Sequence, residues 1–172
     1  MFRKFKEKKI RDKRGFTLIE VITVLLIISL GMVGVLSLIS QNIRSQSLNK
    51  NTLIAYQLAQ EGVELIRQVR DTNWREGVDW QTDLNAGTYY MDYQDRTPHL
   101  ALSASYGNLG SDSDGMYYST PGSAAAGSGF SRLIRITEDA TDPKILITVS
   151  IYWSDRGRNF SYDLEAELYD WK

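Results

Sequence analysis

A long apolar stretch near the N-terminus constrains this chain more than any other feature of its sequence. Phe16–Ile39 reads FTLIEVITVLLIISLGMVGVLSLI and carries a single charge, on Glu20. A helix rises roughly 1.5 Å per residue, so this stretch is about 36 Å long, and the hydrocarbon core of a bilayer is about 30 Å thick. The sequence therefore predicts a membrane-spanning helix over residues 16–39.

Charge is distributed unevenly on the two sides of this stretch. Residues 1–15 contain eight Lys and Arg against two acidic residues, and the rest of the chain contains 12 basic and 19 acidic residues. Basic residues beside a membrane helix stay on the cytoplasmic side. We expect a single-pass protein of the cytoplasmic membrane, with a basic leader (1–15) inside and an acidic body outside.

Two ordinary explanations of an apolar N-terminal stretch fit less well. A secretory signal peptide has a shorter apolar core, of roughly 7–15 residues, and a small-residue cleavage site after it. Here the small residue, Gly15, comes before the apolar stretch. A plain membrane anchor leaves Glu20 unexplained, because a carboxylate in hydrocarbon costs several kcal/mol unless it is paired.

Glu20 indicates assembly with other chains. The residues within one helical turn of it carry no positive charge. A cut after Gly15 would create a charged amine on Phe16, and that amine on one subunit would neutralise Glu20 on the next. The pattern thus favours a helix that packs against identical or similar helices.

The residues Lys13–Glu20, KRGFTLIE, closely resemble the prepilin cleavage motif of type IV pilins and of the related type II secretion pseudopilins. The resemblance implies that a prepilin peptidase cuts between Gly15 and Phe16 and methylates the new amine of Phe16. It also implies assembly roles for Thr17 and Glu20. The implied partners are other pilin subunits, the prepilin peptidase, the inner-membrane pilus assembly machinery and, before assembly, the membrane.

Helical periodicity continues beyond the membrane stretch, over residues 40–73. One face is apolar or small and carries Ala55, Leu58, Ala59, Gly62, Ile66 and Val69. This spacing predicts an amphipathic helix that ends near Asp71–Asn73. The segment Leu58–Trp74, LAQEGVELIRQVRDTNW, also resembles minor pilins of the PilV-like type.

The remaining residues, 74–172, predict a β-rich head. Apolar and polar residues alternate in Ile145–Trp153 and in Phe160–Leu168, and Asp155–Arg158 between them predicts a hairpin turn. Two further strands are expected over Phe130–Thr137 and Gly87–Tyr93, and a flexible loop near 103–129. The predicted fold class is α+β and pilin-like, with a long N-terminal helix packed on a C-terminal antiparallel sheet of about three to five strands.

Little in the head predicts catalysis, a cofactor or a nucleic-acid surface. The chain has no cysteine, and its one histidine, His99, is interpreted as structural. Asp112 and Asp114 are weak calcium candidates, since a full calcium loop needs more oxygen ligands; otherwise neither a metal nor a cofactor is expected. The acidic residues of the head disfavour nucleic-acid binding, because binding to phosphates needs a basic patch. Four arginines are candidates for a small patch of this kind: Arg132, Arg135, Arg156 and Arg158.

The sequence therefore predicts a structural subunit, a minor pilin that starts in the cytoplasmic membrane and ends in an extracellular pilus. It would be a substrate of the prepilin peptidase and not itself an enzyme. A type II secretion or competence pseudopilin is the first alternative, since it shares the N-terminal motif. A binding module or adhesin that uses the anchor to display its head is the second.

Overall fold

The computed structural model describes residues 15–120, 127–139 and 141–170. The chain divides into two compact units, Met1–Ser45 and Gln46–Lys172. The predicted leader lies outside the described residues except for Gly15, and so does the central part of the Gly/Ser-rich stretch 119–129.

One helix, α1 (Leu18–Glu76), accounts for 59 residues. Its C-terminus is built around Gly77, whose φ is 75°. The N–H of Gly77 donates to the carbonyl of Trp74 (3.3 Å) and the N–H of Val78 to that of Asn73 (3.1 Å). These two bonds form a Schellman motif, which satisfies carbonyls that the helix leaves unpaired. The helix therefore ends a few residues later than the sequence pattern predicted.

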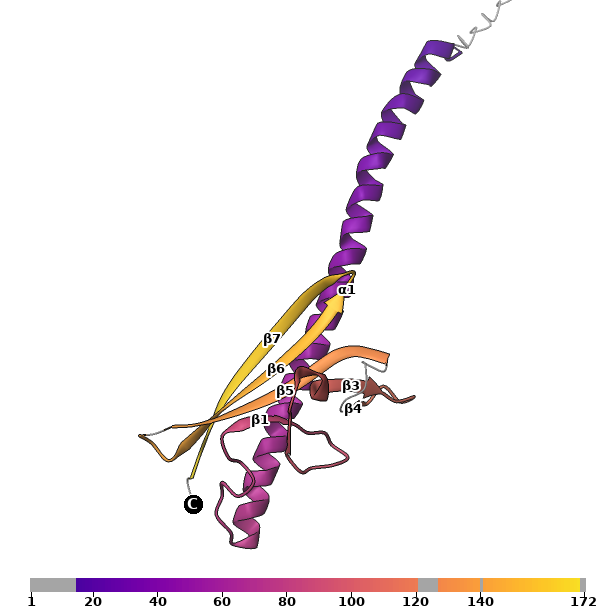
Figure 1. Cartoon of the computed structure of the whole chain (residues 1–172). Coiled ribbons are helices and arrows are strands. Elements are labelled where there is room, and N and C mark those ends of the chain that lie inside the picture. Colours follow the sequence, from indigo (N-terminus) through magenta and orange to yellow (C-terminus); the bar gives the residue numbers. More distant parts are fainter. Residues whose placement is uncertain (1–14, 121–126, 140, 171–172) are drawn as a thin grey trace, which may run out of the picture. The chain divides into compact units, whose positions relative to one another are not determined.

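The head contains one antiparallel sheet, which has seven strands in the described part of the chain (Figure 1). The strands are β1 (Gly87–Tyr90), β2 (His99–Leu100), β3 (Asn108–Ser111), β4 (Tyr117–Ser119), β5 (Gly127–Glu138), β6 (Lys144–Asp155) and β7 (Arg158–Tyr169). On one side β5 pairs with β6, which pairs with β7; on the other side β5 pairs with β1 and β3, which continue to β2 and β4. A short 3₁₀ helix, Ala104–Gly107, precedes β3.

The predicted α+β, pilin-like arrangement is confirmed, since a long N-terminal helix packs on an antiparallel sheet. The four predicted strands correspond to β1, β5, β6 and β7, and the predicted hairpin joins β6 to β7. The sheet is larger than the expected three to five strands. The additional strands β2, β3 and β4 have two to four residues each, too few to show an alternating pattern.

The β6–β7 hairpin turn has an unusual backbone. Asp155 pairs with Arg158, and both residues between them have positive φ, 50° at Arg156 and 77° at Gly157. Two successive positive φ values are what a type I′ turn requires, and that turn follows the natural twist of two paired strands. It fixes the register of two strands of 12 residues each.

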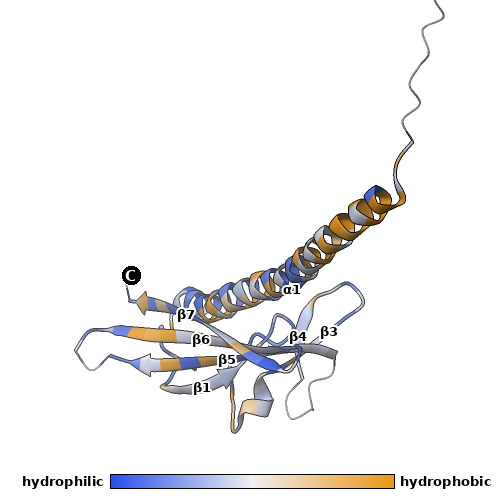
Figure 2. Cartoon of the chain, turned by 90° about the horizontal axis from the view of Figure 1, so that it is seen from above, coloured by the Kyte–Doolittle hydropathy of each residue, from blue (hydrophilic) through white to orange (hydrophobic). Residues whose placement is uncertain are grey.

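The hydrophobic core lies between the second part of α1 and one face of the sheet. Figure 2 shows apolar residues alternating with polar ones along the long strands and concentrated in the N-terminal part of α1. The predicted helix face is confirmed: Ala55, Leu58, Ala59, Gly62 and Ile66 are buried, and Val69 packs against the core. The sheet contributes Ile134, Ile136, Ile145, Ile147, Val149, Ile151 and Leu168.

A buried arginine lies in this core. Arg132 is 2% exposed, and its guanidinium donates to the carbonyls of Leu58 (3.2 Å) and Met91 (2.8 Å). It also forms an ion pair with Glu61 at 3.3 Å. Desolvation lowers the pKa of Arg132, while the charges of Glu61 and Asp92 oppose that change. Arg132 thus connects α1 to β5 from inside and is not available for the surface basic patch considered from the sequence.

Candidate functional site

The N-terminus of α1 is capped by its own sequence. The hydroxyl of Thr17 accepts a hydrogen bond from the N–H of Glu20 at 3.3 Å, and the Thr17 carbonyl accepts from Glu20 (3.1 Å) and Val21 (3.2 Å). Thr-x-x-Glu is the spacing of a capping box. The negative charge of Glu20 lies in the first turn, where the helix dipole favours it. Thr17 and Glu20 are therefore brought together at the start of the helix.

Glu20 lies on an apolar surface. Phe16, Val21, Val24 and Leu25 line a shallow hollow of about 260 Å³ with it. Among the described residues, no basic side chain forms an ion pair with Glu20. A carboxylate surrounded by apolar side chains lowers its free energy by acquiring a positive partner.

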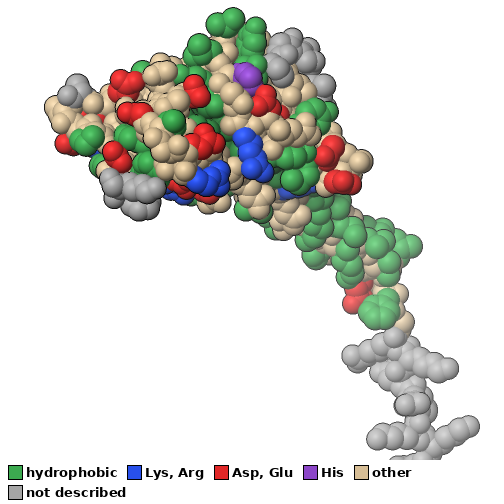
Figure 3. Space-filling model, turned by 90° about the horizontal axis from the view of Figure 1, so that it is seen from below, with side chains coloured by type: hydrophobic (Ala, Val, Ile, Leu, Met, Phe, Trp, Pro, Cys, Tyr) green, Lys and Arg blue, Asp and Glu red, His purple; other side chains and the backbone are tan. Residues whose placement is uncertain are grey.

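From Phe16 to Ile43 the surface of α1 and the two residues before it is largely apolar on every side, as Figure 3 shows for one face. All large apolar side chains from Phe16 to Ile43 are exposed, Phe16 by 82%. Among the described residues, α1 is the helix that is long and apolar enough to cross a membrane. A helix that is apolar all round requires a lipid environment or contact with other helices.

Three hydroxyl groups in and just after the apolar stretch are satisfied inside the helix. Thr23 donates to the carbonyl of Ile19 (2.7 Å), Ser29 to that of Leu25 (2.6 Å) and Ser40 to that of Leu36 (3.0 Å). Each is a bond from residue i to residue i−4, which reduces the polarity that the side chain presents outward. The segment can therefore enter hydrocarbon in spite of these polar residues.

The predicted cleavage site precedes the helix. Gly15 and Phe16 are exposed and lie outside α1, which begins at Leu18. A Cβ atom built on Gly15 would meet nothing within 4 Å. Both residues are therefore accessible and are not held in a helix.

The two calcium candidates lie in the turn between β3 and β4. One carboxylate oxygen of Asp112 accepts backbone hydrogen bonds from Asp114 (3.0 Å) and Met116 (2.8 Å). Those bonds close the turn without a metal ion. In the described residues no group of three or more acidic or histidine side chains is arranged to hold a metal.

His99 forms an exposed pair with Asp95 at 2.7 Å and stacks on Tyr90 with ring centroids 5.2 Å apart. The hydrogen bond from His99 lowers the pKa of Asp95, with further hydrogen bonds from Thr97. In the described part of the chain no serine or threonine forms a hydrogen bond to His99, so the geometry gives no nucleophile–base pair.

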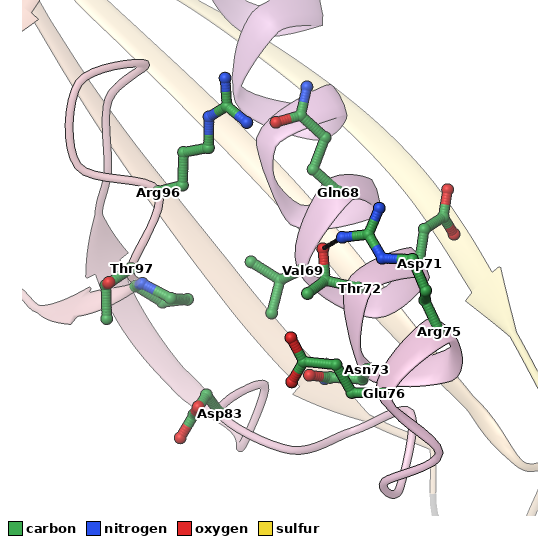
Figure 4. A pocket seen from close by; sticks show the side chains of 11 residues that line it. Gln68, Val69, Asp71, Thr72, Asn73, Arg75, Glu76, Asp83, Arg96 and Thr97 are labelled. Atoms are coloured by element: carbon green, nitrogen blue, oxygen red, sulfur yellow. Dashed lines mark hydrogen bonds between the residues drawn. The ribbon is translucent and has the colours of Figure 1, made fainter.

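The head has a polar pocket of about 560 Å³ beside the C-terminal end of α1 (Figure 4). Gln68 and Arg75 come from the helix and Arg96 from the loop before β2. Arg75 donates to the hydroxyl of Thr72 at 3.3 Å. Carboxylates, arginines and amides line this pocket. Among the described residues, no hydrogen bond in it joins a nucleophile to a base.

A family profile matches the N-terminal part of the chain. Residues 10–36 match the profile of the prokaryotic N-terminal methylation motif. The matched range contains Gly15, Phe16, Thr17 and Glu20. The motif indicates a subunit of the type IV pilin or pseudopilin kind, which a prepilin peptidase processes and which assembles with other pilins.

No match was found among the curated proteins or among the solved structures. The resemblance of Leu58–Trp74 to PilV-like minor pilins therefore stays a prediction.

Proposed function

We propose that the chain is a structural subunit, a minor pilin of a type IV pilus or of a pilus-like filament. The peptidase cuts between Gly15 and Phe16 and methylates the amine of Phe16. The mature helix then leaves the membrane and packs with other pilin helices in the filament core. In this scheme the chain is a substrate and not an enzyme, and it uses no cofactor.

The observation that carries this proposal is Glu20. It is an acid in the first turn of a helix that is otherwise apolar on all sides, and the described residues provide no basic partner for it. Cleavage makes a cation on Phe16, one helical turn away along the chain. When helices pack side by side, the Phe16 amine of one subunit satisfies Glu20 of its neighbour in a medium of low dielectric constant.

Mass spectrometry of the mature N-terminus tests the processing step. In cells with an active prepilin peptidase we expect a chain that begins at a methylated Phe16. Gly15→Val should block the cut, because a bulky side chain then occupies the cleavage position. Gly31→Ala is the control, since that glycine is equally open but lies inside the helix. Recovery of an intact Met1 from the unaltered chain would overturn the proposal.

The assembly step is tested with Glu20→Gln, which removes the charge and keeps the shape. We expect normal processing and membrane insertion, but at least a tenfold loss of the subunit from sheared filaments, since a charge-assisted pair is worth about 1.5–3 kcal/mol. Glu76→Gln, at the other end of α1, should leave incorporation unchanged. Equal incorporation of Glu20→Gln and the unaltered chain would contradict the role of Glu20.

The same fractionation separates the alternatives. Recovery from sheared surface filaments favours a pilus, and retention in the cell envelope favours a type II secretion or competence pseudopilin. A processed chain that enters no filament and displays its head would favour the adhesin.

A further inference from the structure

One edge of the head sheet is open over its full length. β7 spans 12 residues and, in the described part of the chain, pairs with β6 alone. In an antiparallel strand every second residue turns its N–H and C=O away from the existing neighbour, so roughly six residues of β7 have backbone groups available to another strand. Figure 1 shows β7 at the outer side of the long β5–β6–β7 part of the sheet.

Most of the devices that usually protect such an edge are missing from β7, but one is present, since the strand carries charged side chains. Its register with β6 runs without interruption from Arg158 to Tyr169, so it contains no bulge. It also contains neither proline nor lysine. Natural edge strands are commonly protected by these features, by shortness, or by a covering helix or loop. What β7 does carry is a row of acids.

That row lies on one face of the strand. Asp163, Glu165 and Glu167 alternate with half-buried apolar residues and are exposed. Glu167 is bound by Lys144 at 3.2 Å. Within the described residues, Asp163 and Glu165 form no ion pair. The edge thus presents two unneutralised carboxylates at a spacing of two residues.

The opposite face of β7 borders a groove in the head. The groove has a volume of about 620 Å³ and lies between α1 and β7. Three apolar residues line it, Val63, Leu164 and Ala166, together with six polar or charged ones, Gln57, Gln60, Glu61, Glu64, Arg67 and Glu165. Tyr56 of α1 stacks on Tyr162 of β7, with ring centroids 4.5 Å apart. A strand added beside β7 would direct alternate side chains to the face of β7 that carries the half-buried Tyr162, Leu164 and Ala166, and the others to the face that carries the acids.

We propose that the free edge of β7 binds an extended segment of another protein by strand addition, and that this segment alternates basic and apolar residues. Its main chain continues the sheet, its Lys or Arg side chains lie opposite Asp163 and Glu165, and its apolar side chains lie beside the half-buried Leu164 and Ala166 on the other face of β7. A second copy of β7 is a poor occupant, because two acidic rows would then face each other. This inference goes beyond the proposed function, since it concerns the head alone.

The test uses the full chain in detergent micelles and a nine-residue peptide in which Lys or Arg alternates with Val. We expect binding with slower hydrogen exchange of β7 amides. A peptide of the same composition in scrambled order should bind at least tenfold more weakly, since it loses the cross-strand pairs that the alternating order forms with β7. Equal binding of the ordered and scrambled peptides, or unchanged exchange of β7, would overturn the proposal.

Charge reversal provides the second arm. The double variant Asp163→Lys, Glu165→Lys should bind the basic peptide about tenfold more weakly. It should bind a peptide in which Glu replaces Lys and Arg, and this binding also shows that the variant is folded. Asp114→Lys, an equal change per residue in the β3–β4 turn, should alter neither affinity. If β7 amides are protected without peptide, in proportion to protein concentration, a second copy occupies the edge and the proposal is wrong.

Discussion

Arg132 brings a full positive charge into the head. Burial opposes this charge, and the groups that offset the cost are the two carbonyls of Leu58 and Met91 and the carboxylate of Glu61. Asp92 adds a second negative charge nearby, and its carboxylate accepts backbone hydrogen bonds from Gln94 (2.9 Å) and Ser119 (2.8 Å). A single residue of β5 therefore holds α1 and the loop after β1 in place.

Truncation of this side chain should be costly. Arg132→Ala leaves two carbonyls without a donor and a cavity in the core, and we expect the free energy of unfolding to fall by about 3 kcal/mol. Arg132→Met fills most of the volume and should cost less. The measurement is unfolding of the full chain in micelles by tryptophan fluorescence, since all four tryptophans lie in residues 74–171. Arg135→Ala, exposed on the same strand, is the control; an equal loss there would contradict the argument.

Asp139, which directly follows β5, makes a pH-dependent contribution to the stability of the head. Hydrogen bonds from the hydroxyl (2.6 Å) and the N–H (2.9 Å) of Thr141, in that order of effect, lower the pKa of Asp139 from 3.8 to about 2. A lowered pKa means that the carboxylate stabilises the folded head above pH 3.8, and that this stabilisation is lost as the pH falls from 3.8 to about 2.

Carboxyl NMR titration checks this prediction. Thr141→Val removes the hydroxyl donor and should move the pKa of Asp139 up toward its usual value, while the N–H bond remains. Thr137→Val, on the exposed face of β5, is the matched control. A normal pKa at Asp139 in the unaltered head would show that the Thr141 bonds do not form in solution.

At the level of elements, the contact between α1 and the sheet depends on a glycine. A Cβ atom at Gly62 would lie 2.8 Å from a methyl group of Val149 and 3.2 Å from Cδ of Arg132. The absence of a side chain lets the helix approach the sheet and leaves room for Arg132 to reach Leu58. Close packing of this kind tolerates little added volume.

Gly62→Ala should therefore destabilise the head. Alanine favours a helix over glycine by about 1 kcal/mol, but overpacking costs about 1–3 kcal/mol, and we expect a net loss in the unfolding of the head. Gly34→Ala in the same helix, where nothing lies within 4 Å, should leave the tryptophan transition unchanged. A more stable Gly62→Ala variant would mean that helix propensity outweighs the contact.

The strength of each sequence prediction follows from how local its signal is. The sequence predicts the methylation motif and the long strands because the residues of each pattern follow one another in the chain. The sequence prediction that Arg132 lies on the surface is wrong. Alternation along β5 places Arg132 on the same face as Ile134 and Ile136, which are buried. The groove beside β7 brings Gln57 and Leu164 together, and no local pattern predicts which distant segments lie next to each other.

At the level of the whole molecule, the two units have different requirements. Every buried core residue falls between Ala55 and Leu168, inside the second unit. About 130 residues are enough to bury a core without help from disulfides, which this chain, having no cysteine, does not form. The first unit instead exposes its apolar side chains and depends on lipid or on other subunits.

A chain that starts at Gln46 should therefore fold alone. We expect cooperative unfolding of this fragment with the midpoint that the full chain shows in micelles, and no recovery of it in filaments. Circular dichroism and fractionation measure the two outcomes. A fragment that unfolds without cooperativity would show that the head needs the N-terminal unit.

The inward-turned hydroxyls of Thr23, Ser29 and Ser40 affect how a bundle of such helices can move. Because these three donors are already occupied, they offer a neighbouring helix no further donor, and the many apolar side chains around them interact through dispersion forces, which depend weakly on axial displacement. Among the described residues from Phe16 to Ile39, Glu20 is the one charged group, and its charge distinguishes one height along the helix from the others. In the filament proposed above, such helices would slide along most of their length at little cost, and the subunit spacing would be set near Glu20 at the start of each helix.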